Sequence, residues 1–497
     1  MTEACSAGRI VTTAMPHYDL VIRNATIVDG TRAPRFQADV AIQKGRIQKI
    51  GPVENEDSGR VIDASGKILA PGFIDAHTHD DRLMLSGPDM SPKVSQGVTT
   101  VVAGNCGISL APAPRGISKT VTPPLDLLAD ESSWFRFPTF KQYIEELQNK
   151  PAATNCALLV GHTMLRVQTM EDLGKPASDG EIANMQKMVD EALDAGAIGL
   201  STGLYYEPAR AATTEEVIEV CRPLSARNAL YCTHMRSEAD GVVDSLEETF
   251  RIGRELAIPV VVSHHKVMGT PNYGRSAETL PIIEKAMRSQ EIGLDCYPYR
   301  ASSTILSWSR VGIASKVLVS WSKPHPEFSG MDLKEIARTM NLSEEEAVQK
   351  LLPAGAIYFA MDETDVQRIL GFEHTMIGSD GLPHDVAPHP RLWGTFARVL
   401  GHYRRLGLFS LEEAVHKMTG LTAGTFGLAG RGAVKEGFAA DLVLFDEASV
   451  DDVASFEKPV APAKGIGMVI VNGEPVWYEG RPTGARPGQV LTRTPSQ

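Results

Sequence analysis

The stretch Pro71-Gly-Phe-Ile-Asp-Ala-His-Thr-His-Asp80 decides how the rest of this 497-residue chain is interpreted. Its apolar pair Phe73-Ile74 leads into two histidines spaced two residues apart. Because side chains alternate along a strand, His77 and His79 project to the same side. Two imidazoles aimed at one point indicate a metal site, although hydrogen bonding in a polar core would account for one or both of them. A strand that ends on such a pair is typical of a parallel α/β barrel.

Seven further apolar runs follow, separated by segments with the period of amphipathic helices. Together they predict an α/β fold of the (β/α)8 TIM-barrel type. Several runs end abruptly in a polar or reactive residue, as a buried strand does when it delivers its last side chain to the active-site face of a barrel. The eight expected strands are Gly72–His79, Val98–Cys106, Cys156–His162, Ala197–Leu204, Ala229–His234, Ile258–His264, Ile292–Tyr299 and Thr375–Asp380.

Short strand and turn patterns at both chain ends predict a small β-sandwich domain. They cover Asp19–Arg23, Ala25–Gly30, Asp39–Ile42, Arg46–Ile50, Asp441–Phe445 and Met468–Gly473. We expect this domain to comprise residues 17–70 plus 425–497, after a loose leader of residues 1–16, and to flank a catalytic barrel of residues 71–424. Residues 301–356 are too long for a simple connection within a barrel, which predicts an inserted helical subdomain or lid.

Composition narrows the class of protein. With 43% hydrophobic and 22% charged residues, the chain is typical of a soluble globular protein. Its net charge of −12 disfavours nucleic-acid binding and a basic membrane-facing surface. The six cysteines form no C-x-x-C pair, and we find neither a signal peptide nor an apolar run of the roughly 20 residues that a membrane span needs. We expect a cytoplasmic enzyme with a small-molecule substrate, acting as a monomer or small homo-oligomer.

Residues able to bind metal stand at the ends of four of these strands besides the first histidine pair. They are Cys106, His234, His264 and Asp380. Imidazole nitrogen and thiolate sulfur are ligands that zinc prefers in proteins. Alone, Cys106 could be a buried structural cysteine and Asp380 a helix cap. Their joint placement at one face of a barrel indicates a metal centre.

Seven motifs carry a family resemblance. They are Gly72–Asp80, Gly97–Ser109, Ser201–Gly203, Ser263–Lys266, Asp295–Tyr299, Gly378–His384 and Pro388–Gly394. Together they resemble the D-aminoacylases (N-acyl-D-amino-acid deacylases) of the amidohydrolase superfamily, from about Tyr18 to the C-terminus. The His-x-His pair marks only the superfamily, whereas Gly-Asn-Cys-Gly, Ser-His-His-Lys and His-Pro-Arg-Leu-Trp-Gly are specific to this branch.

The resemblance implies zinc-dependent hydrolysis of the amide bond of N-acyl-D-amino acids. The residues that it implies for a tightly bound zinc ion are Cys106, His234 and His264, and those for a weaker or empty second position are His77, His79 and Asp380. Many superfamily members bridge two metals with a carboxylated lysine, but Ala197–Gly203 contains none. The cysteine would take that place, and one functional zinc ion is expected.

Asp380 is the expected general base, which accepts a proton from water and passes it to the departing amine. Cys106 as a covalent nucleophile is an alternative, weakened because a thiolate that binds zinc is less free to attack. For the free α-carboxylate of the substrate, the resemblance supports Lys266, Arg391 and Tyr297. A guanidinium grips a carboxylate with two hydrogen bonds, and lysine adds a point charge.

The substrate side chain is open to two interpretations. Arg300, directly after Tyr299, would bind an acidic side chain, with Arg310 in the lid as a second candidate, so that N-acyl-D-aspartate or N-acyl-D-glutamate would be favoured. Alternatively, Arg300 points away and a hydrophobic pocket accepts D-Met, D-Leu or D-Phe. The residues expected to line that pocket are Tyr205, Leu306, Tyr358 and Met361.

Two other functions remain open. A hydrolase of cyclic amides, of the hydantoinase or dihydroorotase type, or a deaminase would share the barrel, but the absent lysine and the pair Lys266 and Arg391 count against both. A non-catalytic scaffold would be expected to have lost some metal ligands, whereas all six are present.

Overall fold

The computed structural model describes residues 18–54, 59–117 and 121–494, so the expected leader 1–16 lies outside the described residues. Its main body is a barrel of eight parallel strands, hydrogen-bonded in the order in which they occur in the chain. They are β6 (Phe73–Asp75), β7 (Val98–Ala103), β8 (Asn155–Gly161), β9 (Gly199–Gly203), β10 (Leu230–His234), β11 (Val260–Val262), β12 (Ile292–Cys296) and β16 (Thr375–Ile377). Each of the eight predicted strands overlaps one of them, and the predicted barrel is confirmed.

The barrel closes where β6 meets β16. Ala76 donates its backbone N–H to Ile377 O at 3.2 Å, Asp380 donates to His77 O at 2.8 Å, and one parallel bridge pairs Thr78 with Gly381. These contacts lie beyond the regular parts of both strands. The seam of the barrel therefore runs directly beside the candidate metal ligands.

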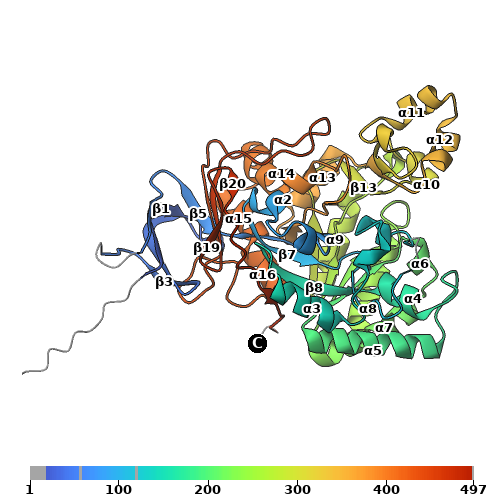
Figure 1. The fold of residues 1–497 in the computed structure, drawn as a ribbon, viewed down its shortest axis with the longest axis horizontal. Helices are drawn as coiled ribbons and strands as arrows, with labels where there is room; N and C mark the ends of the chain where they lie inside the picture. The colour runs from blue at the N-terminus through green and yellow to red at the C-terminus, as the bar shows by residue number, and fades with distance from the viewer. Residues whose placement is uncertain (1–17, 55–58, 118–120, 495–497) are drawn as a thin grey trace, which may run out of the picture.

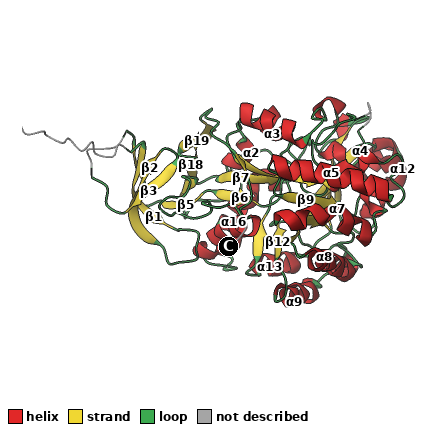
Figure 2. Cartoon of the chain, turned by 90° about the horizontal axis from the view of Figure 1, so that it is seen from below, coloured by secondary structure: helices red, strands yellow, loops and turns green. Residues whose placement is uncertain are grey.

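Helices surround the barrel strands, as Figure 2 shows. Side chains cap the N-termini of several helices. Thr139 forms a reciprocal capping box with Gln142, and Ser178 forms one with Glu181. The helices are α1 (Leu83–Ser86), α2 (Ser91–Val94), α3 (Phe140–Asn149), α4 (His162–Thr169), α5 (Asp179–Ala195), α6 (Glu207–Arg210), α7 (Thr214–Arg227), α8 (Val242–Leu256), α9 (Ser276–Met287), α13 (Glu363–Gly371), α14 (Arg391–Arg398), α15 (Leu411–Met418) and α16 (Gly420–Phe426).

Apolar side chains fill the interior of the barrel. The cluster includes Ile74, Val102, Leu159, Leu230 and Val261 from the strands and Phe426 from α16. Strand β21 (Val490–Leu491) near the C-terminus runs parallel to β8 and pairs with its first half. The interior of the barrel is thus a packed core, and the space for a functional site lies at the carboxyl-terminal ends of the strands.

Strands from both chain ends form one nine-stranded sheet, at the left of Figure 1. The order is β20-β19-β18-β17-β5-β1-β2-β3, with β4 paired to β1, so the strands expected in a sandwich share a single hydrogen-bonded sheet. They are β1 (Leu20–Ile27), β2 (Phe36–Gln43), β3 (Arg46–Ile50), β4 (Val61–Asp63), β5 (Ile68–Pro71), β17 (Leu442–Phe445), β18 (Ile466–Val471), β19 (Glu474–Tyr478) and β20 (Arg481–Pro482). Apolar residues on one side form their own cluster, whereas Val443 and Phe445 on the other join the large cluster in which the barrel strands pack against the helices.

The two strands expected over Asp19–Arg23 and Ala25–Gly30 are one strand, β1. Asn24 has a left-handed backbone, with φ of 58°, and the pairing of β1 with β2 shifts register between Ile22 and Ala25. Asn adopts this conformation more readily than most residues, so the bulge imitates a turn signal in the sequence.

The inserted segment differs from the helical subdomain that the sequence predicted. It contains an antiparallel sheet of β13 (Ala301–Ile305), β15 (Ala354–Phe359) and β14 (Val317–Ser322), together with α10 (Trp308–Val311), α11 (Leu333–Met340) and α12 (Glu344–Leu351). It projects at the upper right of Figure 1. We keep the division into residues 17–70 plus 425–497, 71–424 and 301–356 as a proposal.

Two further findings bear on the sequence analysis. Of the helices within the described ranges, none combines the length and the apolar character that crossing a membrane requires. The five cysteines located there are all buried and free of disulfide bonds, and they are Cys106, Cys156, Cys221, Cys232 and Cys296.

Candidate metal centre and substrate pocket

All six candidate metal ligands meet at the carboxyl-terminal face of the barrel. They form two groups, and the ligand atoms within each group lie no more than 4.8 Å apart. One group is His77, His79, Cys106 and Asp380, and the other is Cys106, His234 and His264. Cys106 belongs to both, which is the position that a bridging ligand would occupy.

The thiol of Cys106 lies at the centre of this arrangement. Its Sγ is 3.3 Å from Nε2 of His77 and 3.3 Å from Nε2 of His264. Cys106, His264 and Asp380 all have positive φ angles, of 54°, 37° and 50°. Non-glycine residues rarely adopt this backbone conformation, which persists only where the surrounding structure imposes it. Such residues cluster at functional sites, and here three of the six candidate ligands share the feature.

Asp380 connects the candidate metal centre to the substrate side of the pocket. Its Oδ1 is 3.2 Å from Nε2 of His79, and its Oδ2 is 2.9 Å from Nη1 of Arg391. Burial raises the pKa of Asp380, but Arg391 and the neighbouring histidines lower it more and hold it well below its usual range. The carboxylate is therefore ionised and can accept a proton.

Glu238 is a functional candidate that the sequence analysis missed. It is 5% exposed, and its Oε1 lies 3.0 Å from Nδ1 of His264 and also pairs with Lys266. Its Oε2 lies 3.6 Å from Nε2 of His234. The one available signal was its position four residues after His234, at the start of a loop that leads away from the barrel face. A carboxylate behind a ligand histidine fixes the orientation and tautomer of the ring.

The donor set fits a zinc ion. Imidazole nitrogens and a thiolate are the ligands that this borderline-soft ion prefers. All six residues are buried, and neither ring nitrogen of His234 has a hydrogen-bond partner among the described residues. Buried polar groups normally have hydrogen-bond partners. Unpaired nitrogens next to a thiol therefore indicate a place where these side chains can bind a metal ion.

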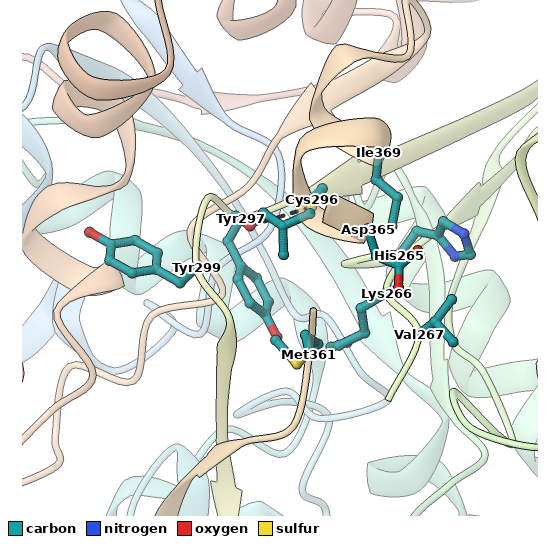
Figure 3. A pocket seen from close by; sticks show the side chains of 10 residues that line it. His265, Lys266, Val267, Cys296, Tyr297, Tyr299, Met361, Asp365 and Ile369 are labelled. Atoms are coloured by element: carbon teal, nitrogen blue, oxygen red, sulfur yellow. Dashed lines mark hydrogen bonds between the residues drawn. The ribbon is translucent and has the colours of Figure 1, made fainter. Parts of the chain in front are cut away.

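Three residues predicted to bind the substrate α-carboxylate lie beside one another. The ring centroid of Tyr297 is 4.5 Å from the guanidinium carbon of Arg391 and 5.6 Å from Nζ of Lys266. Figure 3 shows the side chains of Lys266 and Tyr297 extending toward each other, with Met361 beside them. The hydroxyl of Tyr297 is buried and has no hydrogen-bond partner in the described part of the chain.

Arg300 does not join them. The side chain is exposed and lines neither the cavity of the candidate ligands nor the one beside Tyr297 and Lys266, so this geometry gives no support to the prediction that it binds the substrate side chain. Tyr299 before it is buried, and the chain bends at Pro298 and again at Arg300.

Arg310, the second candidate, is 4% exposed and lines the cavity of the candidate ligands. Its guanidinium carbon stands 4.0 Å from the ring centroid of Tyr205. Both residues also line an adjoining cavity of about 270 Å³. Of the residues of the hydrophobic alternative, Leu306 and Tyr358 are buried without lining either of these two cavities. Met361 lines a different cavity, together with Tyr297 and Lys266.

The inserted segment covers the cavity that contains the candidate metal ligands. Ser302, Ser303 and Thr304 of β13 line it, and the backbone oxygen of Ser303 accepts a hydrogen bond from Arg391 at 3.2 Å. Thr304 lies 2.9 Å from the hydroxyl of Tyr206, which follows β9 and also lines the cavity. Tyr206 carried no signal in the sequence that separated it from a core tyrosine.

The model of the amidohydrolase family matches residues 60–286 and 335–477. The chain belongs to this family. The unmatched interval, residues 287–334, contains the whole of the inserted segment before α11.

Near full-length similarity places the chain beside the deacylases of D-amino acids within that family. D-aminoacylase of Alcaligenes xylosoxydans xylosoxydans is 57% identical over 478 residues, covering 96% of this chain and 98% of that protein. N-acyl-D-aspartate deacylase of the same organism is 52% identical over 476 residues, covering 95% of each. The crystal structure of N-acyl-D-glutamate deacylase from Bordetella bronchiseptica, complexed with zinc and a phosphonate inhibitor that mimics the tetrahedral intermediate, superposes with a TM-score of 0.92 at 45% identity, covering 96% of this chain and 99% of that one.

Proposed function

We propose that this protein hydrolyses the amide bond of N-acyl-D-amino acids with a bound zinc ion, and that it favours acidic side chains. The observation that carries the proposal is the convergence of two ligand groups with Lys266 and Arg310 at one cavity, where a third cation, Arg391, pairs with Asp380. The relatives described above, with their activities on N-acyl-D-amino acids, support the reaction class.

We assign the tightly bound zinc ion to Cys106, His234 and His264, and a weaker position to His77, His79 and Asp380. When bound, zinc would supply a Lewis acid for the acyl carbonyl and a water of lowered pKa. The shared thiolate would replace the lysine-derived bridge that the sequence lacks. This charge on Cys106 requires the ion, because burial alone raises the pKa of its thiol well above the usual range.

The protein's own side chains would orient the substrate and move the proton. Lys266, Tyr297 and Arg391 would hold the free α-carboxylate and so fix the position of the scissile amide. Asp380, ionised and 2.9 Å from Arg391, would take the proton from the attacking water and deliver it to the leaving nitrogen. One carboxylate thus serves first as base and then as acid.

Arg310 would bind the acidic side chain of the substrate. It is buried, always charged, and braced against the ring of Tyr205. A buried guanidinium without a carboxylate partner is costly, and an acidic substrate would provide that partner. This assignment replaces Arg300 and keeps the preference for D-aspartate or D-glutamate.

We also propose that the protein works in the cytoplasm, as a monomer or small homo-oligomer. The free cysteines of the described residues support a reducing compartment.

The test compares hydrolysis of N-acetyl-D-Asp, N-acetyl-D-Glu, N-acetyl-D-Met and their L counterparts by the wild type, Arg310→Met and, as a matched control, Arg300→Met. We expect the wild type to prefer the acidic D substrates. In Arg310→Met, the transition state for the acidic D substrates should lose roughly 2–5 kcal/mol of stabilisation, and kcat/KM for these substrates should fall accordingly. The value for N-acetyl-D-Met should change little. Arg300→Met should behave as the wild type.

Each other outcome has a definite meaning. A wild-type preference for N-acetyl-D-Met would refute the acidic pocket while leaving the deacylase, and activity confined to L substrates or to cyclic amides would refute the deacylase. Removal of metal by a chelator should abolish activity, and added zinc should restore it.

A further inference from the structure

A buried ammonium group lies behind the candidate metal centre, at the seam where the barrel closes. Lys93, in the short helix α2, has no exposed surface. Its Nζ donates to Asp75 Oδ2 at 2.9 Å and to Ser379 Oγ at 2.8 Å, and it lies 3.3 Å from Asp80 Oδ2. One side chain therefore contacts both strand ends that meet at the seam.

Asp75 extends this contact to the backbone of the candidate ligands. Its Oδ1 accepts the N–H of Ser379 at 2.8 Å and the N–H of His77 at 3.3 Å. Ser379 directly precedes Asp380, and its Oγ accepts the N–H of Gly381 at 3.3 Å. The network thus holds the backbone on both sides of the seam, next to His77 on one side and around Asp380 on the other.

The same segment also anchors the helix that carries Arg391. Gln96 is fully buried, donates through Nε2 to Leu392 O at 2.9 Å, and accepts the N–H of Phe396 at 3.0 Å. Helix α14 begins at Arg391, whose guanidinium pairs with Asp380. Residues 93–96 consequently hold both members of the Arg391–Asp380 pair.

Stability alone does not explain why an ammonium is buried here. Burial lowers the pKa of Lys93, but Asp75 and Asp80 raise it more, so the group stays charged. Apolar side chains of similar size often serve as well as a buried ion pair in energetic terms. The charged group adds a geometric constraint, because the acceptor oxygens of three residues at two strand ends must all face one nitrogen.

We propose that Lys93 is a positioning residue of this site, which sets the placement of Asp380 relative to His77 and His79 by joining Asp75 to Ser379. The hydrogen bonds and ion pairs of Lys93 go to Asp75, Ser379 and Asp80, none of which is a candidate metal ligand or substrate-binding residue. The inference rests on the proposed function for its effect on turnover, whereas its effect on the weaker metal position is independent of the reaction.

The experiment measures kcat and a Co²⁺ titration followed by absorption, for the wild type and Lys93→Met. Substituting Lys93 should weaken the second Co²⁺ equivalent and lower kcat, each by roughly 10- to 100-fold. The first equivalent, assigned to Cys106, His234 and His264, should bind as in the wild type. A wild type that hydrolyses no N-acyl-D-amino acid would refute the proposed function, while the Co²⁺ titration would still decide the role of Lys93.

Lys417→Met is the matched control. Lys417 is equally buried, and its ammonium binds the backbone oxygens of Phe372 and Thr375 at the opposite end of β16. It should lose stability without changing the second Co²⁺ equivalent or kcat. Equal effects of both substitutions on these two quantities, or no effect of Lys93→Met on either, would overturn the proposal.

Two further variants keep the test decisive if Lys93→Met fails to fold. Ser379→Ala removes one acceptor with little change in volume and should shift the same two quantities in the same direction by a smaller factor. Lys93→Arg keeps the charge and should retain more of both than Lys93→Met. If Ser379→Ala folds and leaves both quantities unchanged, the assignment is refuted.

Discussion

Glu238 Oε1 lies 3.0 Å from Nδ1 of His264, and Nζ of Lys266 lies 2.7 Å from the same nitrogen. A neutral imidazole nitrogen either donates or accepts, so Nδ1 cannot satisfy both neighbours at once. Donation to Glu238 leaves the lone pair of Nε2 facing Cys106, which is the tautomer that a metal ligand needs. Lys266 then keeps its contacts with Glu238 and with the backbone oxygen of His264, and the N–H that faced the ring is available to a carboxylate of the substrate.

Glu238→Gln should therefore weaken zinc binding. The amide keeps the volume, but its oxygen is a weaker acceptor for His264, and a loss of roughly 10- to 100-fold in affinity is expected for such a partner. The measurement is competition with a chromophoric chelator. Glu248→Gln, which loses an ion pair with Arg236 outside the site, is the control and should bind zinc as tightly as the wild type.

Substitutions in the two ligand groups should have different effects on the amount of zinc that the protein binds. His234→Ala removes a ligand of the group that we assign to tight binding, whereas His79→Ala removes one from the weaker group. After dialysis we expect about one zinc ion per chain in the wild type and in His79→Ala, and far less in His234→Ala. Metal analysis of the purified proteins measures this. The reverse pattern would exchange the two assignments.

Leu127 and Leu382 should limit the length of the acyl group. They are the aliphatic side chains among the described residues that line the cavity of the metal centre, and the remaining lining is polar or aromatic. Leu127→Ala should raise kcat/KM for N-butyryl relative to N-acetyl substrates by about tenfold, since one or two methylenes contribute that much selectivity. Leu224→Ala, buried in α7 away from the cavity, should leave the ratio unchanged.

A buried ion pair beside the barrel should make stability depend on pH. Burial raises the pKa of Glu216, but His162, the N–H of Ala177 at 2.7 Å and Arg166 lower it more, to about 2 from 4.5. A carboxyl with a depressed pKa stabilises the fold above its unfolded pKa, and this contribution is lost as the pH falls toward 2. It amounts to about 3 kcal/mol.

Glu216→Gln lacks this contribution. Its free energy of unfolding should lie below that of the wild type by about 3 kcal/mol at neutral pH, and the gap should narrow as the pH falls below about 4.5. Urea unfolding across that range measures both proteins. A gap that stays constant with pH would show that Glu216 does not act through its charge.

The barrel was predictable because its strands are apolar runs that end in reactive residues. Strand ends such as those at His234 and His264 carried the decisive signal, since a barrel brings the carboxyl ends of all its strands to one face. The bulge at Asn24 and the sheet of the inserted segment were not predictable in the same way. A single left-handed residue resembles a turn, and the length of an insertion does not reveal its secondary structure.

The site residues also divide into those that the sequence predicted and those that it did not. All six proposed metal ligands converge, whereas Arg300 is exposed and does not line their cavity. The chain bends at Pro298 and Arg300, and the direction of a side chain at such bends does not follow from the sequence. Lys93 and Glu238 lie in loops or short helices with no periodic pattern. Their placement depends on how α2 and the segment after β10 pack onto the barrel, and this is tertiary information that no local pattern contains.

The sheet built from both chain ends has a consequence for synthesis on the ribosome. Strand β5 pairs with β17, Ala70 opposite Val443, so the first strands emerge long before their neighbours. The whole catalytic barrel must fold inside the loop that this pairing closes, and such distant pairings form late because they close a very long loop. Until then one side of β5 presents unpaired backbone groups, which makes the unfinished chain vulnerable to aggregation and dependent on its final strands.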